Sequence, residues 1–189
     1  AQDLIRVLGT AHGDYLRERV ERQRRGVPDG MPDGNRRCWG NMVWLLNDSW
    51  PIIYWSIIDY YLEPKIASYY LRRSVEPILV TFVLSNVEIF VWVVNDSPST
   101  ISDDLTVKRR TFQGDTLGEL TERVDVGPGE AKRCFSTTEL GPVVKRHEFL
   151  QAEFAQRETS QLLIAERYLH LPGAGLNARF HDGKIFVSS

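Results

Sequence analysis

Short runs of strand-forming residues after Pro77 constrain the fold of this chain more than any other feature. About eight such runs, at intervals of roughly ten residues, are typical of an antiparallel β-sandwich. Turn-forming sequences such as Asn95-Asp96-Ser97-Pro98 and Gly127-Pro128-Gly129 separate several of them. The runs cover residues 78–84, 87–94, 105–113, 116–126, 131–136, 145–154, 161–169 and 178–187. We therefore expect residues 77–189 to form a sandwich domain.

The first 25 residues show helical rather than strand periodicity. Leu4, Leu8, Ala11 and Tyr15 share one helical face, although Gly9 and Thr10 could interrupt the helix. From residue 11 to residue 25 the pattern continues, with Leu16 and Val20 expected to face inward, and Gly26 and Pro28 end it.

Residues 38–46 then have the composition and length of a buried strand, and a long aromatic loop follows. A second helix is expected over residues 64–74, with Pro64 as its first residue. Its expected packing face consists of Ile66, Tyr69, Tyr70 and Arg73. The order helix, strand, loop, helix corresponds to one and a half units of a parallel α/β fold, so we place the domain boundary near Glu76.

Composition excludes several classes of function. The net charge is −2, from 23 basic and 25 acidic residues, which provides no field that favours nucleic acid or an anionic membrane. The longest apolar runs are too short to span a bilayer. Cys38 and Cys134 lie far apart, and the four histidines are scattered, so neither a metal site nor a disulfide framework is predicted. Buried free thiols are the expected state of the two cysteines.

The segment from Trp44 to Tyr61 is the part of the chain that suggests chemistry. It contains three of the five tryptophans, Trp44, Trp50 and Trp55, interleaved with short polar residues. Flat aromatic faces match the C–H faces of a pyranose ring, and short polar side chains bind its hydroxyl groups. A packed aromatic core with turn-forming Asn and Asp is the alternative that composition leaves open.

Several motifs give this segment a resemblance to a known family. Trp-Leu-Leu-Asn-Asp-Ser-Trp-Pro (44–51), Trp-Ser-Ile-Ile-Asp-Tyr-Tyr (55–61), Pro-Lys (64–65) and Tyr-Tyr-Leu-Arg-Arg (69–73) resemble the last strand and helix of the catalytic barrel in glycoside hydrolase family 2. The β-mannosidase and exo-β-glucosaminidase branch is the most similar. Residues 91–96 resemble, more weakly, the immunoglobulin-like domain that follows that barrel. The resemblance implies that residues 1–76 are the end of a (β/α)8 TIM barrel and that residues 77–189 are an immunoglobulin-like β-sandwich.

The resemblance also implies a retaining hydrolase of terminal β-linked sugars that uses no metal or organic cofactor. Such enzymes use two carboxyl groups about 5–5.5 Å apart. In this family both are glutamates on earlier strands, and one directly follows an Asn. Because no Asn-Glu pair occurs here, we expect no catalytic residue in this chain, and its partner is then the missing N-terminal part of the same enzyme.

The residues that match the family suggest a sugar subsite. Trp44 corresponds to the tryptophan that forms the floor of the subsite for the cleaved sugar, at the end of the eighth strand, where barrel active sites lie. Asn47 and Asp48 begin the next loop, and either sugar contact or bracing of the loop is open for them. Packing roles are expected for Trp50, Trp55 and Asp59.

Two other functions remain as alternatives. The sandwich could be an independent carbohydrate- or protein-binding module, although its only Trp and Tyr residues are Trp92 and Tyr168, and Trp92 is expected in the core. The chain could also be a complete small enzyme with Asp48 and Asp59 as acid and base. The second alternative is weak, because one and a half β/α units cannot enclose such a pair.

Overall fold

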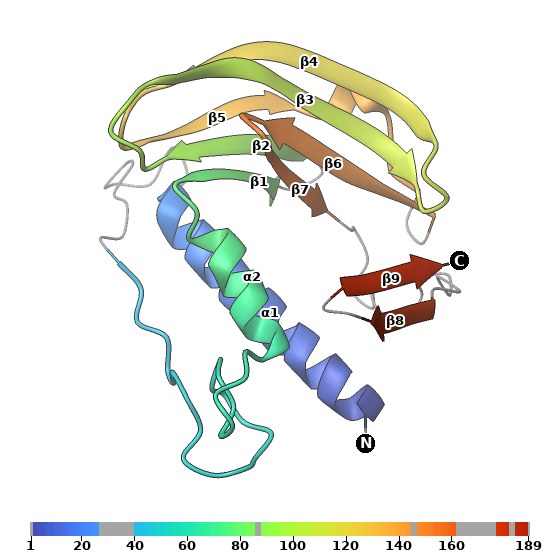
Figure 1. The fold of residues 1–189 in the computed structure, drawn as a ribbon. Coiled ribbons are helices and arrows are strands. Elements are labelled where there is room, and N and C mark those ends of the chain that lie inside the picture. The colour runs from blue at the N-terminus through green and yellow to red at the C-terminus, as the bar shows by residue number, and fades with distance from the viewer. Residues whose placement is uncertain are drawn as a thin grey trace.

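The computed structural model describes residues 2–26, 40–85, 88–144, 147–161, 177–181 and 184–188. Two helices, α1 (Gln2–Arg25) and α2 (Ile66–Ser74), lie side by side, and an irregular loop region joins them (Figure 1). The strands begin with β1 at Ile78. The two larger sheets lie beyond the C-terminal ends of both helices, whereas the strand pair formed by β8 (Asn177–His181) and β9 (Lys184–Ser188) does not.

Two antiparallel sheets form the predicted sandwich. One sheet has the strand order β1-β2-β5, with β1 at Ile78–Ser85, β2 at Glu88–Asn95 and β5 at Glu130–Ser136. The other has the order β4-β3-β6-β7, built from β3 (Ile101–Thr111), β4 (Thr116–Val126), β6 (Glu148–Phe154) and β7 (Arg157–Gln161). A single turn of 3-10 helix, η1 (Thr138–Leu140), follows β5. The predicted sandwich is confirmed.

The core lies between these two sheets and follows the alternation of the strands. Alternate residues of β2, β3 and β6 point inward and are almost completely buried, as expected for strands with one face on a core. These residues include Val91, Val93, Leu105, Val107, Leu150, Ala152 and Phe154. Trp92 points to the opposite face of β2 and is only partly buried, so its predicted place in the core is wrong.

Two details of the strand prediction differ from the structure. The single strand expected at 178–187 is a pair, β8 (Asn177–His181) and β9 (Lys184–Ser188), in a separate antiparallel sheet. Strand β7 was missed, because its connection to β6 consists of Ala155 and Gln156, at φ 48° and 64°. Neither residue is a usual signal for a tight hairpin turn, which normally has Gly, Asn or Asp at positive φ. Most of the strand expected at 161–169 lies outside the described residues.

Helix α1 is continuous through Gly9 and Thr10, so the interruption allowed for at this point does not occur. A Cβ atom at Gly13 would lie 2.7 Å from the Tyr70 ring, and one at Gly9 would lie 3.0 Å from Ile66. The two glycines therefore let α2 approach α1 closely, which offsets their low helix propensity. Leu16 and Val20 are buried, as predicted, and α1 ends just before Gly26.

Helix α2 differs from its prediction at its start and in its packing face. It begins at Ile66 rather than Pro64, because Pro64 forms a β-bridge with Ile58. Ala67 and Ser74 are its buried residues, whereas Tyr69 and Arg73 are exposed. Of the predicted face, Ile66 and Tyr70 therefore pack on α1, whereas Tyr69 and Arg73 do not.

The strand expected at residues 38–46 does not form over its described part, residues 40–46. Only a single parallel bridge, between Asn47 and Ile58, forms at its end. A parallel strand is stable only when neighbouring strands satisfy its backbone groups. Among the described residues no strand pairs with residues 40–46, and the carbonyls of Leu45 and Leu46 accept hydrogen bonds from the loop residues Ile57 and Ile58 instead, which explains the difference.

A polar seam connects the end of α1 to the sandwich. Arg24, which is 7% exposed, pairs with Asp96 at 2.8 Å and donates to the Ser74 carbonyl at 2.5 Å. Thr81 on β1 accepts a hydrogen bond from Arg25 at 2.9 Å and donates one to Glu21. Burial raises the pKa of Glu21, although the Thr81 hydroxyl and the nearby arginines oppose this. The seam fixes both helices to the first strand of the sandwich.

Candidate functional site

The segment from Trp44 to Lys65, here called the aromatic loop, folds back on itself through backbone hydrogen bonds. Ile57 N donates to Leu45 O at 3.2 Å, and Ile58 N donates to Leu46 O at 2.9 Å. Asp48 N donates a hydrogen bond to Ile58 O at 3.2 Å. The two arms of the loop are thus joined by backbone hydrogen bonds directly after Trp44.

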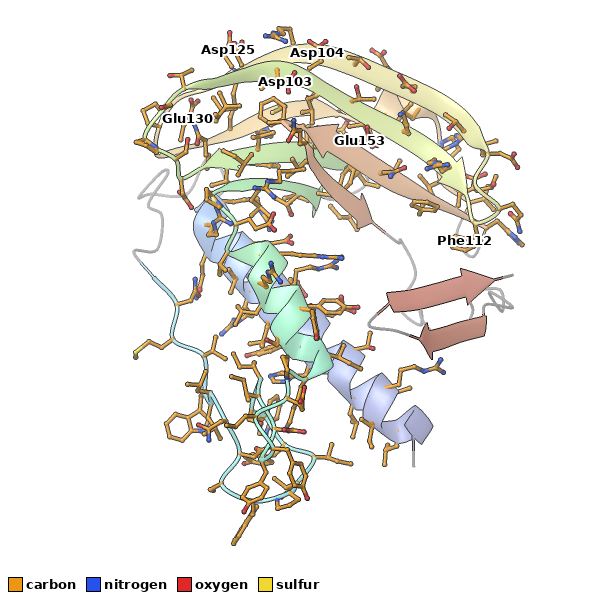
Figure 2. The ribbon with its side chains drawn as sticks, viewed as in Figure 1. Asp103, Asp104, Phe112, Asp125, Glu130 and Glu153 are labelled. Carbon is orange, nitrogen blue, oxygen red and sulfur yellow. The ribbon has the colours of Figure 1, made fainter. Side chains whose placement is uncertain are left out.

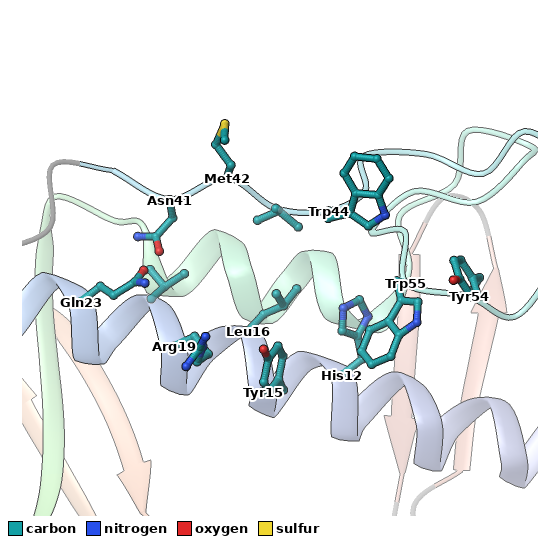
Figure 3. Close-up of a pocket in the computed structure, with 12 residues that line it drawn as sticks. His12, Tyr15, Leu16, Arg19, Gln23, Asn41, Met42, Trp44, Tyr54 and Trp55 are labelled. Carbon is teal, nitrogen blue, oxygen red and sulfur yellow. The ribbon is translucent and has the colours of Figure 1, made fainter.

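Trp44 projects from the beginning of this loop with 81% of its surface exposed. It lines one edge of a cavity of about 440 Å³ between α1 and the loop. Figure 3 shows Trp44 on the loop, whereas Trp55 reaches from the loop to lie beside His12 of α1, and Tyr15 lies one turn further along the helix. Because Trp44 is so exposed, its flat indole is available to a ligand or to another part of a protein. The Trp44–Leu45 peptide bond is cis.

Asp48 is buried, in contrast to Trp44. Its carboxylate pairs with Lys65 Nζ at 2.5 Å. Burial alone would raise the pKa of Asp48, but hydrogen bonds from Lys65 and Ser56 and the Lys65 charge outweigh it and hold the pKa below its usual value. Asn47 is exposed, and its side-chain amide donates to the Asp48 carbonyl at 3.3 Å. In this chain both polar residues contact the loop itself.

Packing roles were predicted for Trp50, Trp55 and Asp59, and the structure gives the three residues different surroundings. Asp59 accepts hydrogen bonds from the backbone of Tyr61 at 2.8 Å and of Glu63 at 2.9 Å, so it holds a turn rather than the start of α2. Trp55 contacts His12 edge-on at 5.5 Å between ring centroids. Burial and the Lys65 charge lower the pKa of His12. Trp50 and Trp55 are both more than half exposed.

Exposed apolar surface is concentrated in the N-terminal part of the chain. Of the 21 exposed large hydrophobic residues among those described, 18 belong to residues 2–76. A second cavity, of about 700 Å³, runs along the same side of α1 between the helix and the aromatic loop. Its lining includes Ile5, Leu8, Ile52, Ile53 and Ile66. Exposed apolar side chains gathered around a cavity mark a site of contact with another part of a protein or with a ligand.

The sandwich has a different surface. Acidic side chains such as Asp103, Asp104, Asp125 and Glu153 lie around its sheets (Figure 2), and several have basic partners. Arg123 lies 3.3 Å from Asp104, and Lys108 lies 3.9 Å from Glu153. The stacked pair Phe112 and Phe149, with centroids 5.9 Å apart, is half-buried. The described part of the sandwich therefore presents a polar surface without a broad aromatic strip.

The described residues contain neither a candidate metal site nor a helix that could span a membrane. Within the described residues there is no group of three or more His, Cys, Asp or Glu side chains that could hold a metal ion. Burial raises the pKa of the Cys134 thiol to about 11, so it is not a reactive thiolate. Cys38 lies outside the described residues. Neither of the two described helices is long and apolar enough to cross a membrane.

Lys65 and His12 are the residues of this site that sequence reasoning missed. The signal for Lys65 was a lysine directly before a helix, where an acceptor side chain is normal. No pattern in the sequence pointed to His12, because its contact with Trp55 joins residues 43 positions apart.

The family that this chain matches and two of its relatives are described as mannosidases. Residues 87–170 match the family described as Mannosidase Ig/CBM-like domain. Beta-mannosidase B of Thermothelomyces thermophilus is 45% identical over 47 residues, which are 25% of this chain and 6% of that protein. Beta-mannosidase B of Aspergillus flavus is 51% identical over 45 residues, which are 24% of this chain and 5% of that protein. The matched segments are thus small parts of these relatives.

Solved structures extend the likeness to most of the chain. The β-D-mannosidase of Dictyoglomus thermophilum matches 85% of this chain with a TM-score of 0.70 and 25% identity, and the match covers 19% of that protein. The exo-chitosanase CsxA of Amycolatopsis orientalis matches 87% with a TM-score of 0.69 at 18% identity, covering 20% of its own chain, which indicates a shared fold. The resemblance to the β-mannosidase and exo-β-glucosaminidase branch is confirmed.

Proposed function

We propose that this chain is the C-terminal part of a retaining, β-mannosidase-like glycosidase that hydrolyses terminal β-linked sugars of oligosaccharides or glycoconjugates. Residues 1–76 form the end of its catalytic (β/α)8 barrel, and residues 77–189 form an immunoglobulin-like accessory domain, with the boundary near Glu76. The observation that carries the proposal is the concentration of exposed apolar side chains in residues 2–76.

This distribution of apolar surface suits a barrel segment that packs against other strands and helices. Inner strands of parallel sheets are apolar on both faces because helices and neighbouring strands cover them. Burial of such surface contributes about 25 cal/mol per Å². Leu4, Ile5, Leu8 and the isoleucines of the aromatic loop would supply that contact, whereas the sandwich already has a closed core.

The role of the chain in the reaction is to complete a sugar subsite. The exposed indole of Trp44 would stack against the C–H face of the terminal sugar. Asn47, three residues further along the loop, is exposed and would bind a hydroxyl group, whereas Asp48 braces the loop through Lys65. The acid/base and the nucleophile would come from the rest of the barrel, about 5–5.5 Å apart as retention of configuration requires.

A chimeric enzyme tests this function. In the chimera, this chain replaces the segment of the Dictyoglomus thermophilum β-mannosidase to which it aligns. We expect the chimera to release nitrophenol from an aryl β-mannoside. A chimera that is folded by circular dichroism but does not hydrolyse any of the aryl β-mannoside, β-glucosaminide and β-glucoside would contradict the proposal.

The chain by itself should be inactive, since the catalytic carboxyl pair is expected elsewhere. Purified chain incubated with the same aryl glycosides should release no nitrophenol above the rate in buffer. Affinity electrophoresis of the chain through gels containing mannan or chitosan tests the alternative of an independent binding module. Retardation that persists in a Trp44→Ala variant would favour that alternative, because the sandwich would then bind the polysaccharide.

A further inference from the structure

Lys65 occupies a position where its charge is unfavourable for the helix that follows. It is the N-cap residue of α2, and its side chain accepts no hydrogen bond from the first turn. N-cap positions favour Ser, Thr, Asp and Asn, and a cation at a helix N-terminus opposes the helix dipole. The contribution of Lys65 must therefore lie in contacts outside α2.

Those contacts all lie in the aromatic loop. Lys65 Nζ is 2.5 Å from Asp48 Oδ2, 3.3 Å from the Tyr54 carbonyl oxygen and 3.5 Å from the Ile52 carbonyl oxygen. The Asp48 side chain is only 2% exposed, so the ion pair is screened little by solvent on that side. A single ammonium group thus joins the start of the loop to its middle.

The backbone extends this clamp toward Trp44. Lys65 N donates to Ile57 O at 2.9 Å, and Ile57 N donates to Leu45 O, the carbonyl next to Trp44. The side chain and the main chain of Lys65 therefore hold two different points of the same loop. Trp44 itself has little covering it, so the loop backbone is what fixes the point from which its indole projects.

We infer that Lys65 is a positioning residue, which acts through Asp48 to hold the aromatic loop in the conformation that presents Trp44 to the sugar. The inference rests on the proposed function for its sugar ligand, but the clamp itself is a property of this chain. Without Lys65, the buried Asp48 carboxylate loses its counter-ion, and a buried charge without a counter-ion destabilises the conformation that contains it.

The clamp can be tested in the 189-residue chain without any substrate. Hydrogen exchange should be measured at the amides of Asp48, Ile57, Ile58 and Lys65 in the unsubstituted chain and in Lys65→Met. Because Lys65→Met removes a hydrogen bond to a charged group, exchange at these amides should be at least roughly tenfold faster in Lys65→Met. The double variant Asp48→Asn/Lys65→Met should exchange more slowly than Lys65→Met, because it removes the unpaired charge.

A lysine of the sandwich provides the matched control. Lys108 forms ion pairs with Glu119 and Glu153 at 3.8 and 3.9 Å, both partners being about half exposed. Lys108→Met should leave exchange in the aromatic loop unchanged. Equal exchange in Lys65→Met and the unsubstituted chain, or unprotected amides in the latter, would overturn the inference.

Kinetics of the chimera distinguish positioning from a merely structural role. If Lys65→Met lowers the fraction of competent loop to about one tenth, the apparent KM for aryl β-mannoside rises about tenfold while kcat stays the same. Loss of folded enzyme would instead lower the apparent kcat and leave KM unchanged, and this result would contradict positioning. An inactive unsubstituted chimera would count against the proposed function, whereas the exchange experiment would still decide the clamp.

Discussion

Replacing Trp44 by alanine in the chimeric enzyme should lower kcat/KM for an aryl β-mannoside by roughly five- to 150-fold. This range corresponds to the loss of about 1–3 kcal/mol of aromatic contact with the sugar. Part of that contact should strengthen as the ring flattens toward the oxocarbenium-like transition state, so kcat should fall together with affinity. Steady-state kinetics of the folded variant measure both.

Trp55→Phe is the matched control for Trp44→Ala. Trp55 lies in the same loop but contacts His12 edge-on at 5.5 Å, and a phenyl ring keeps most of that contact. We expect Trp55→Phe to lower the free energy of unfolding and to leave kcat and KM close to those of the unsubstituted chimera. If Trp44→Ala is folded and retains normal kcat and KM, its assignment to the sugar subsite is wrong.

The second large effect should appear in stability. Phe154 is 1% exposed and lies between the sheets with Leu105, Val107 and Leu150. Phe154→Ala in the 189-residue chain should reduce the free energy of unfolding of the sandwich by about 3–5 kcal/mol, since truncation leaves a cavity in a packed core. A shift of this size should lower the melting temperature of the sandwich by more than about 10 °C.

Leu84→Ala is the control, because it truncates an apolar side chain outside the packed core. Leu84 lies on β1 of the same domain but is 65% exposed. Its replacement should change the free energy of unfolding by less than about 0.5 kcal/mol. Similar losses for Phe154→Ala and Leu84→Ala in a denaturant titration would mean that the sandwich core is not the one described.

Local sequence patterns predicted the sandwich well because its strands are stabilised by partners within the same chain. The alternation of buried residues in β2 and β6, and the turn after Asn95, follow from side-chain chemistry over a few residues. Strand β7 escaped prediction because Ala155 and Gln156 adopt a turn that their types do not signal. Trp92 was misplaced because an apolar strand does not reveal which of its faces is covered.

The N-terminal part was harder to predict because much of its structure depends on contacts between distant residues. Residues 40–46 look like a buried strand, but a strand requires neighbours that the described chain does not provide. Gly9 looked like a possible helix breaker, yet Gly9 and Gly13 are the positions where Ile66 and Tyr70 pack on α1. The sequence raised bracing by Asp48 as one of two roles, but the partner, Lys65, lies 17 residues away and could not be inferred from spacing.

Complementation in trans tests most directly whether residues 2–76 complete a glycosidase barrel. The Dictyoglomus thermophilum β-mannosidase without its aligned segment would be mixed with increasing amounts of this chain, and hydrolysis of aryl β-mannoside would be measured. We expect activity that rises with the chain and saturates, and that is lost with Leu8→Asp on the exposed face of α1 but kept with Leu117→Asp on the sandwich, the two leucines being 46% and 44% exposed. No activity from two folded partners, or equal activity with Leu8→Asp and the unsubstituted chain, would contradict the account.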